Sequence, residues 1–158
     1  MAVSHLTGAS PLVAAMIALT VAQTLKIFTH YYAEKRWDLK RMVSSGGMPS
    51  SHSATVMGLT ATIGLANGPG DQLFAVCLVM AIIVMYDAMG VRLQAGRQAE
   101  VLNQIIYELP PEHPVSSSTR QPLRDTLGHT PSQVFAGALL GCFVSYICFV
   151  SAGRPTMA

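Results

Sequence analysis

The chain has little charge and no pattern suited to nucleic-acid binding. Of its 158 residues, 11% are charged and 51% are hydrophobic, whereas a soluble domain carries about 25% charged residues. The net charge of +2 is too small to argue for a nucleic-acid partner, and no basic run with interleaved aromatic residues occurs. The composition therefore predicts a protein of the lipid bilayer, and the length predicts one domain over residues 1–158.

Cysteine chemistry and a recognisable leader are also missing from the sequence. Cys77, Cys142 and Cys148 each sit inside an apolar stretch without metal-ligand spacing, so we expect them to pack as small hydrophobic residues. No basic residue precedes the first apolar stretch, so no cleavable signal peptide is expected. Neither a metal site nor a disulfide framework is predicted.

The apolar stretches predict an all-α fold, an integral-membrane helical bundle of about four spanning helices plus one amphipathic helix. Residues 11–28, 72–90 and 131–152 approach the ~20 apolar residues that a spanning helix needs. Residues 51–67 are apolar but rich in Gly, Ala and Thr. Because small residues favour close helix contacts in membranes, we expect this segment to be a central helix surrounded by protein.

A polar but periodic segment, residues 92–109, follows the third predicted span. Apolar residues recur there and just before it at spacings of three to four, which is typical of one helix face. That face comprises Val91, Ala95, Ala99, Leu102, Ile106 and Leu109. We therefore expect an amphipathic helix that leaves the membrane, with Gln98 and Asn103 as surface amides, followed by a Pro- and Ser-rich loop over 110–128.

Lysine and arginine residues predict the orientation of the bundle. They gather in two of the connecting segments: Lys35, Arg36, Lys40 and Arg41, then Arg92, Arg97, Arg120 and Arg124. Since basic loops tend to stay on the cytoplasmic or equivalent side, both segments are expected on one face of the membrane. The ionisable residues at the span ends then share that face: Lys26, His52, Asp87, Arg92 and His129.

Two histidines each stand where an apolar helix is expected to begin. His52 lies in the phrase GGMPSSHSA and His129 in GHTPS, among Ser, Thr and Pro residues that favour the first turn of a helix. Helix N-termini carry unpaired N–H groups and a partial positive charge, so they attract oxyanions. The two motifs together predict a site that holds and attacks a phosphate. An ordinary helix cap beside a surface histidine is the alternative interpretation of each.

Two further charged residues are candidates for such a site. Arg124, five residues before His129, carries a guanidinium able to bind two phosphate oxygens. Asp87 interrupts an apolar run, where an unpaired charge is costly. It is expected to orient a histidine or to pair with a phosphate-binding cation, and a structural aspartate that closes the helix is the alternative. On an ideal helix Arg92 lies on a different face from Asp87, which leaves their direct pairing open.

Four stretches of the chain resemble the small membrane proteins described as acid phosphatase/vanadium-dependent haloperoxidase-related, found in bacteria and, in a closer likeness, in plants and algae. The stretches are residues 36–38, 45–55, 85–103 and 123–141, so most of the chain is covered. The wider superfamily contains type-2 phosphatidic acid phosphatases and vanadium haloperoxidases. The resemblance implies a helical fold in which one histidine attacks phosphorus, a second acts as the acid, and Lys, Arg and backbone N–H groups hold the oxygens.

The resemblance also implies a role for individual residues. The superfamily's Pro-Ser-Gly-His appears as Pro49-Ser50-Ser51-His52, so His52 would be the acid. Its His-x-x-x-Asp begins at His129, which would be the nucleophile, but ends in Gln133. The superfamily's Lys-x6-Arg-Pro signature is absent. The expected catalytic residues are His129, His52 and Asp87, and the expected substrate-binding residues are Lys26, Arg36, Arg41, Ser50, Ser51, Arg92 and Arg124.

The leading hypothesis is a membrane phosphatase that hydrolyses a lipid phosphate monoester through a phosphohistidine, with no cofactor and with vanadate as a phosphate analogue. Its partners would be membrane lipids with phosphate-bearing headgroups, and a homo-oligomer or a membrane complex is left open. The competing hypothesis is a non-catalytic membrane protein of the same fold, a headgroup binder or a subunit of a larger complex. Gln133 favours the second. For an integral membrane protein of plant or algal likeness, the chloroplast and endoplasmic reticulum membranes are both open.

Overall fold

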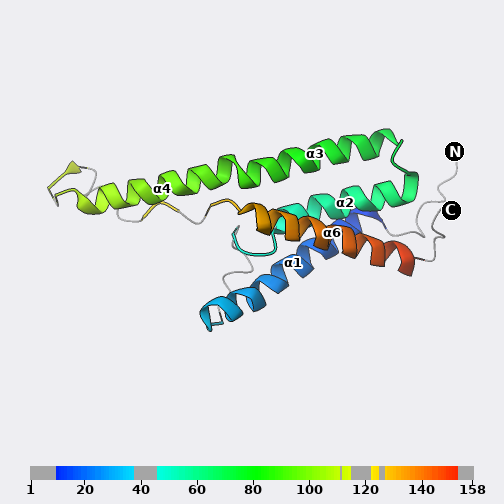
Figure 1. Cartoon of the computed structure of the whole chain (residues 1–158), viewed down its shortest axis with the longest axis horizontal. Helices are drawn as coiled ribbons and strands as arrows, with labels where there is room; N and C mark the ends of the chain where they lie inside the picture. The colour runs from blue at the N-terminus through cyan, green and yellow to red at the C-terminus, as the bar shows by residue number, and fades with distance from the viewer. Residues whose placement is uncertain (1–9, 38–45, 111, 115–121, 125–126, 153–158) are drawn as a thin grey trace.

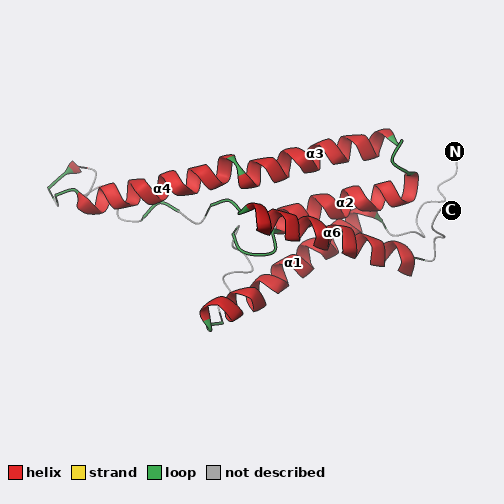
Figure 2. Cartoon of the chain, viewed as in Figure 1, coloured by secondary structure: helices red, strands yellow, loops and turns green. Residues whose placement is uncertain are grey.

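The computed structural model describes residues 10–37, 46–110, 112–114, 122–124 and 127–152, and its regular secondary structure there is helical. Within these ranges it contains no strand (Figure 2). The helices, in chain order, are α1 (Pro11–Glu34), α2 (Ser51–Asn67), α3 (Gln72–Met89), α4 (Val91–Glu108) and α6 (Pro131–Ser151). The predicted all-α class is therefore confirmed.

Three helical stretches are long and apolar enough to cross a membrane. They are Pro11–Tyr32 in α1, the continuous stretch Gln72–Glu108 formed by α3 and α4, and Pro131–Ser151 in α6. The fourth predicted span, α2, has 17 residues and packs against α1, α3 and α6 (Figure 1). The predicted membrane bundle with a central, small-residue helix is thus confirmed. Helix α1 continues past its predicted end at residue 28 and stops only where Lys35 adopts a left-handed conformation.

Helices α2 and α6 run parallel, in register, with both N-termini at the same end of the bundle. At that end the backbone N–H of Ser50 donates to the carbonyl of Gln133 at 3.0 Å. About two turns further along α2 and three along α6, the Ser145 hydroxyl donates to the carbonyl of Gly58 at 2.6 Å. A side-chain hydroxyl can reach a helix carbonyl only where two backbones approach closely, which small residues allow. The parallel arrangement brings two positive helix ends together.

The core between α1, α2 and α6 is built from small side chains. Its fully or nearly buried members are Ala18, Ala22, Ala54 and Val144. Large apolar side chains on the outer faces are exposed instead, as expected where lipid rather than protein surrounds a helix. The bundle is therefore held together by close backbone approach more than by large interlocking side chains.

Helix α4 continues the line of α3 and runs beyond the bundle (Figure 1). The break between them is Gly90, with φ −104° and ψ −90°, outside helical values. The interruption leaves the Ala88 carbonyl to accept the backbone N–H of His129 at 2.9 Å, which ties the start of α6 to the junction. The 18 residues of α4 extend about 27 Å. The predicted amphipathic helix is confirmed, and it projects from the side of the bundle where α2 and α6 begin.

The described residues between α4 and α6 contact α4 at two points, Leu123 and Gly128. The Asn103 side chain accepts the Leu123 N–H at 2.8 Å and donates to the Leu123 carbonyl at 2.9 Å. Gly128 has φ +83°, and a Cβ there would lie 2.4 Å from the backbone nitrogen of Leu93. Only glycine fits that contact. Asn103 is a partly exposed amide on the surface of α4, as expected, and its side chain also anchors the returning segment at Leu123.

Candidate functional site

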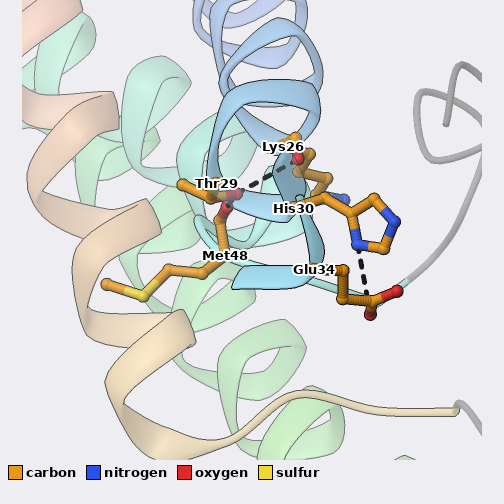
Figure 3. Close-up of polar contacts among 5 residues, drawn as sticks. All are labelled: Lys26, Thr29, His30, Glu34 and Met48. Atoms are coloured by element: carbon orange, nitrogen blue, oxygen red, sulfur yellow. Dashed lines mark hydrogen bonds and ion pairs between the residues drawn. The ribbon is translucent and has the colours of Figure 1, made fainter. Parts of the chain in front are cut away.

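A buried lysine of α1 lies against the first turn of α2. Lys26 is 2% exposed, and its Nζ donates to the Ser51 hydroxyl at 3.2 Å. One turn further along α1, the Thr29 hydroxyl donates to the Met48 carbonyl at 2.6 Å, which docks the loop before α2 onto α1 (Figure 3). Gly47, with φ +95°, lies beside the aliphatic stem of Lys26. An ammonium group is thus held next to a positive helix end.

The starts of α2 and α6 supply backbone donors at the same place. Ser50 is the N-cap of α2, and its hydroxyl accepts the Ser53 N–H at 3.3 Å. The N–H groups of Ser51 and His52, the first two residues of the helix, have no intrahelical acceptor. Because the two helices are parallel, the partial positive charges of their N-termini add at this end of the bundle. The arrangement favours an anion.

Two imidazoles face each other across this end. The ring centroids of His52 and His129 are 5.9 Å apart, with an angle of 63° between the ring planes. The Nδ1 of His52 and the Nε2 of His129 are both buried and have no hydrogen-bond partner among the described residues. A buried polar atom without a partner is costly unless a ligand satisfies it. Residues 77 positions apart in the sequence therefore meet, each with a nitrogen open to a ligand.

Gln133 fixes the tautomer of His129. The side-chain oxygen of Gln133 lies 3.2 Å from His129 Nδ1 and accepts the Thr130 N–H at 3.2 Å. An amide oxygen can only accept, so Nδ1 of His129 carries the proton. In the neutral ring, Nε2 then holds the free lone pair. The nitrogen left open in the site is the nucleophilic one.

The protein environment favours the neutral form of His129. Burial lowers the pKa of the imidazole below its usual 6.5. The hydrogen bond with Gln133 acts in the opposite direction, while the nearby positive charges of Lys26 and Arg92 lower the pKa further. The Nε2 lone pair is therefore available at neutral pH.

Asp87 and Arg92 form an ion pair at the junction of α3 and α4. The Arg92 Nε donates to the Asp87 carboxylate at 2.5 Å. On an ideal helix the two residues would face apart, but the break at Gly90 turns Arg92 back towards Asp87. Asp87 therefore pairs with a cation, which is one of the two roles expected for it. No group of three or more His, Cys, Asp or Glu side chains that could hold a metal occurs within the described ranges.

Two of the expected phosphate-binding arginines, Arg36 and Arg124, do not join this cluster in the structure. Arg36 follows the end of α1 and is exposed, more than two helical turns beyond Lys26. Arg124 is exposed and adjoins Leu123, which is tied to Asn103, about 16 Å along α4 from Arg92. Arg41 lies outside the described residues. The cluster consists of Lys26, Ser50, Ser51, His52, His129 and Gln133, with the Asp87–Arg92 pair at its edge.

Two residues that build the site were missed by sequence reasoning. Thr29 lies three residues after Lys26, on the same helix face, and this spacing was a usable signal. Gly128 precedes His129, and its positive φ and its close approach to the Leu93 backbone determine where His129 lies relative to the start of α4. No local pattern in the sequence indicates that contact, because it depends on the junction between α3 and α4.

Comparison with known proteins shows the family to which the chain belongs. The sequence profile of the Divergent PAP2 family matches residues 7–144, which is most of the chain. The chain belongs to the Divergent PAP2 family. It is also 34% identical over 145 residues to an uncharacterized membrane protein, YuiD, of Bacillus subtilis (strain 168), covering 87% of this chain and 92% of that protein. No solved structure matches the chain significantly.

Membership of the Divergent PAP2 family makes the chain a phosphatase-related membrane protein. The relationship that the sequence motifs implied is confirmed at this level. In this chain, His52 and His129 lie where the N-termini of α2 and α6 meet beside the buried Lys26. Among the described helices no other place combines these features.

Proposed function

We propose that the protein is a membrane phosphatase that hydrolyses a lipid phosphate monoester through a phosphohistidine intermediate. The observation that carries the proposal is the juxtaposition of two imidazoles with unpartnered buried nitrogens above a buried lysine. A phosphate has negative oxygens for Lys26 and the N–H groups of α2, and an electrophilic phosphorus for His129. A metal-free acid–base pair can act on such a substrate.

In the first step, His129 Nε2 attacks phosphorus and the bond from phosphorus to the ester oxygen breaks. His52, protonated, gives its proton to the departing alkoxide, which leaves as an alcohol. In-line attack and proton transfer each require contacts of about 3 Å. A phosphoryl group between the two rings would make one such contact on each side. The 5.9 Å between the ring centroids is of that scale.

In the second step, His52, now neutral, takes a proton from a water molecule that attacks the phosphohistidine. The bond between phosphorus and Nε2 breaks, phosphate leaves, and His129 returns to its neutral form. In both steps Lys26 and the N–H groups of Ser51 and His52 stabilise the charge on the three equatorial oxygens. Preorganised donors of this kind supply the largest share of catalysis in many enzymes.

Gln133 sets the strength of the proposed catalyst. It orients His129 and selects the tautomer, as an aspartate would. Being neutral, it does not stabilise the positive charge that develops on the imidazole when the phosphohistidine forms. We therefore expect a slower enzyme than one with a carboxylate at this position. The same observation favours the second candidate, a protein that binds a phosphate headgroup without hydrolysing it.

The substrate is a lipid because the site lies at the ends of membrane-crossing helices. Lys26 is six residues from the end of the crossing stretch Pro11–Tyr32, and His129 is two residues before α6 begins. A phosphate at this depth is in the interfacial region, with acyl chains in the hydrocarbon. Phosphatidate and phosphatidylglycerophosphate have this form.

A substrate panel tests the proposed function. Purified protein in lipid nanodiscs is incubated with phosphatidate, phosphatidylglycerophosphate and soluble glycerol 3-phosphate, with and without vanadate, and inorganic phosphate is measured. Vanadate-sensitive release from a lipid and not from glycerol 3-phosphate is the expected result. Vanadate binding without release from any lipid would favour the headgroup binder. If the protein neither binds vanadate nor releases phosphate, both the phosphatase and the headgroup binder are overturned.

The pH dependence of phosphate release follows from the His129 environment. Attack requires neutral His129, and burial holds the pKa of this imidazole below 6.5. Protonation therefore removes the nucleophile only when the pH falls below that value, and the acid limb of kcat/KM is expected below pH 6.5. The profile is measured from pH 4.5 to 8 at constant ionic strength. An acid limb above pH 6.5 would contradict a buried neutral nucleophile.

A further inference from the structure

Helix α4 carries a stripe of exposed residues along its whole length. The stripe consists of Val91, Ala95, Gln98, Leu102 and Ile105. Leu102 and Ile105 are 47% and 49% exposed, and Val101 beside them is 56% exposed. A shallow groove of about 420 Å³, lined by Arg97, Gln98, Val101 and Leu102, lies along the same side. Because α4 runs beyond the other helices of the bundle (Figure 1), no other helix covers this exposed apolar surface, and it calls for a covering partner.

The stripe has the spacing of a helix-pairing seam. Successive members are separated by four, three, four and three residues, which is the 3.5-residue repeat of the a and d positions in a coiled coil. Ala95 and Leu102 then occupy a positions, and Val91, Gln98 and Ile105 occupy d positions. Gln98 is the single polar residue in the seam, and one buried polar residue typically specifies register in such pairs.

The described residues of the chain's own returning segment, around Leu123 and Gly128, contact a different face of α4. Gly96 and Ala99 are buried, and Leu93 and Asn103 contact the residues around Gly128 and Leu123. The residues that the sequence assigned to one apolar face of α4 therefore divide between a covered face and an exposed face. Ala99 and Ile106 belong to the covered one, whereas Val91, Ala95 and Leu102 belong to the open stripe.

We propose that the open stripe pairs with the same stripe of a second copy of this chain. Helix α4 continues α3, which crosses the membrane, so every copy inserted in one orientation projects its α4 from the same face (Figure 1). Two such helices are parallel and start at the same height, and identical seam residues therefore meet in register. A helix lying flat on the lipid surface would require a bend that the collinear α3 and α4 do not show.

Membrane anchoring makes so short a seam sufficient. Two and a half heptads are marginal for an isolated pair of helices in water. Two copies confined to one bilayer with fixed orientation meet at a much higher effective concentration, which increases pairing without any additional contact. The proposal does not depend on the phosphatase activity, because the stripe contains none of the residues of the site.

Disulfide cross-linking tests the pairing. In a background with Cys77, Cys142 and Cys148 replaced by alanine, Gln98→Cys is compared with Glu100→Cys, which is exposed at the same height but outside the stripe. Membranes are oxidised, and linked dimers are measured by non-reducing electrophoresis. Gln98→Cys is expected to link in most molecules and Glu100→Cys to remain monomeric. Equal linking at both positions, or none at Gln98→Cys, would overturn the proposal.

The mass of the intact protein gives a second, independent measurement. The wild-type chain, extracted in native nanodiscs, is expected to have the mass of two copies, and Leu102→Glu with Ile105→Glu that of one. Both side chains are exposed in the single chain, so the variant is expected to keep the melting temperature of its bundle. A monomeric wild type, a dimer that survives both substitutions, or a mass that requires a different protein would each overturn the proposal.

Discussion

His129→Ala is expected to reduce phosphate release from the best lipid substrate by at least about 1,000-fold, a typical scale for removing a nucleophile. The reason is that Nε2 of His129 is the atom proposed to form the covalent bond, and no other described side chain presents a buried, unpartnered nitrogen beside it except His52. Lys26 and the α2 N–H groups remain in the variant, so vanadate binding is expected to persist in weakened form. Release is measured under single-turnover conditions, with phosphohistidine trapped by rapid acid-free quenching.

His52→Ala is the matched comparison for that variant. Loss of a general acid costs about 100- to 10,000-fold, but a substrate whose leaving group is already acidic needs no proton. A lipid-like nitrophenyl phosphate is therefore expected to restore much of the rate in His52→Ala and none in His129→Ala. Full activity in His129→Ala, or equal rescue of both variants by the acidic leaving group, would contradict the assigned nucleophile.

The sequence was sufficient for the helices and for the face on which the site lies. Long apolar runs and small residues predict the bundle and its central helix, since these patterns are local. The concentration of Lys and Arg in two connecting segments placed His52 and His129 on one side of the membrane. That is a global inference from charge, and it needed no knowledge of packing.

The details of the site depended on features that local patterns do not carry. The pairing of Asp87 with Arg92 follows from the backbone at Gly90, which departs from an ideal helix. The position of Arg124 follows from Asn103, whose amide pairs with the Leu123 backbone twenty residues away. A motif could indicate that an arginine lies near a histidine in sequence, but not that another side chain would hold it elsewhere.

The close approach of α2 to α6 could not be predicted from the sequence either, although the sequence contains the glycines that allow it. A Cβ on Gly141 would lie 2.4 Å from the Ala54 carbonyl oxygen and 2.8 Å from the Gly58 nitrogen. Both are backbone atoms, so the contact cannot be relieved by a change of side-chain rotamer. The two helices must move apart if this position gains even one methyl group.

Gly141→Ala is therefore expected to destabilise the bundle by about 3 kcal/mol, the upper end of the usual cost of overpacking. For a chain of this length that corresponds to a fall of about 10 °C in the melting temperature, measured by thermal unfolding in one detergent. Gly70→Ala is the matched control, because a Cβ there meets nothing within 4 Å. Since alanine favours helices more than glycine does, an unchanged or higher melting temperature for Gly141→Ala would show that α2 and α6 are not in close contact.

Gly137→Ala extends the same argument to the site. A Cβ at this position, eight residues after His129 and so about two helical turns away, would lie 2.2 Å from the carbonyl oxygen of Ser50, the N-cap of α2. Separation at this point moves the two helix starts apart, and with them the rings of His52 and His129. We expect Gly137→Ala to lose phosphate release at temperatures where it is still folded, by at least about 100-fold, because misplacement of reacting groups by about 1 Å has that effect. Wild-type activity in a folded Gly137→Ala protein would mean that catalysis does not require the observed approach of α2 to α6.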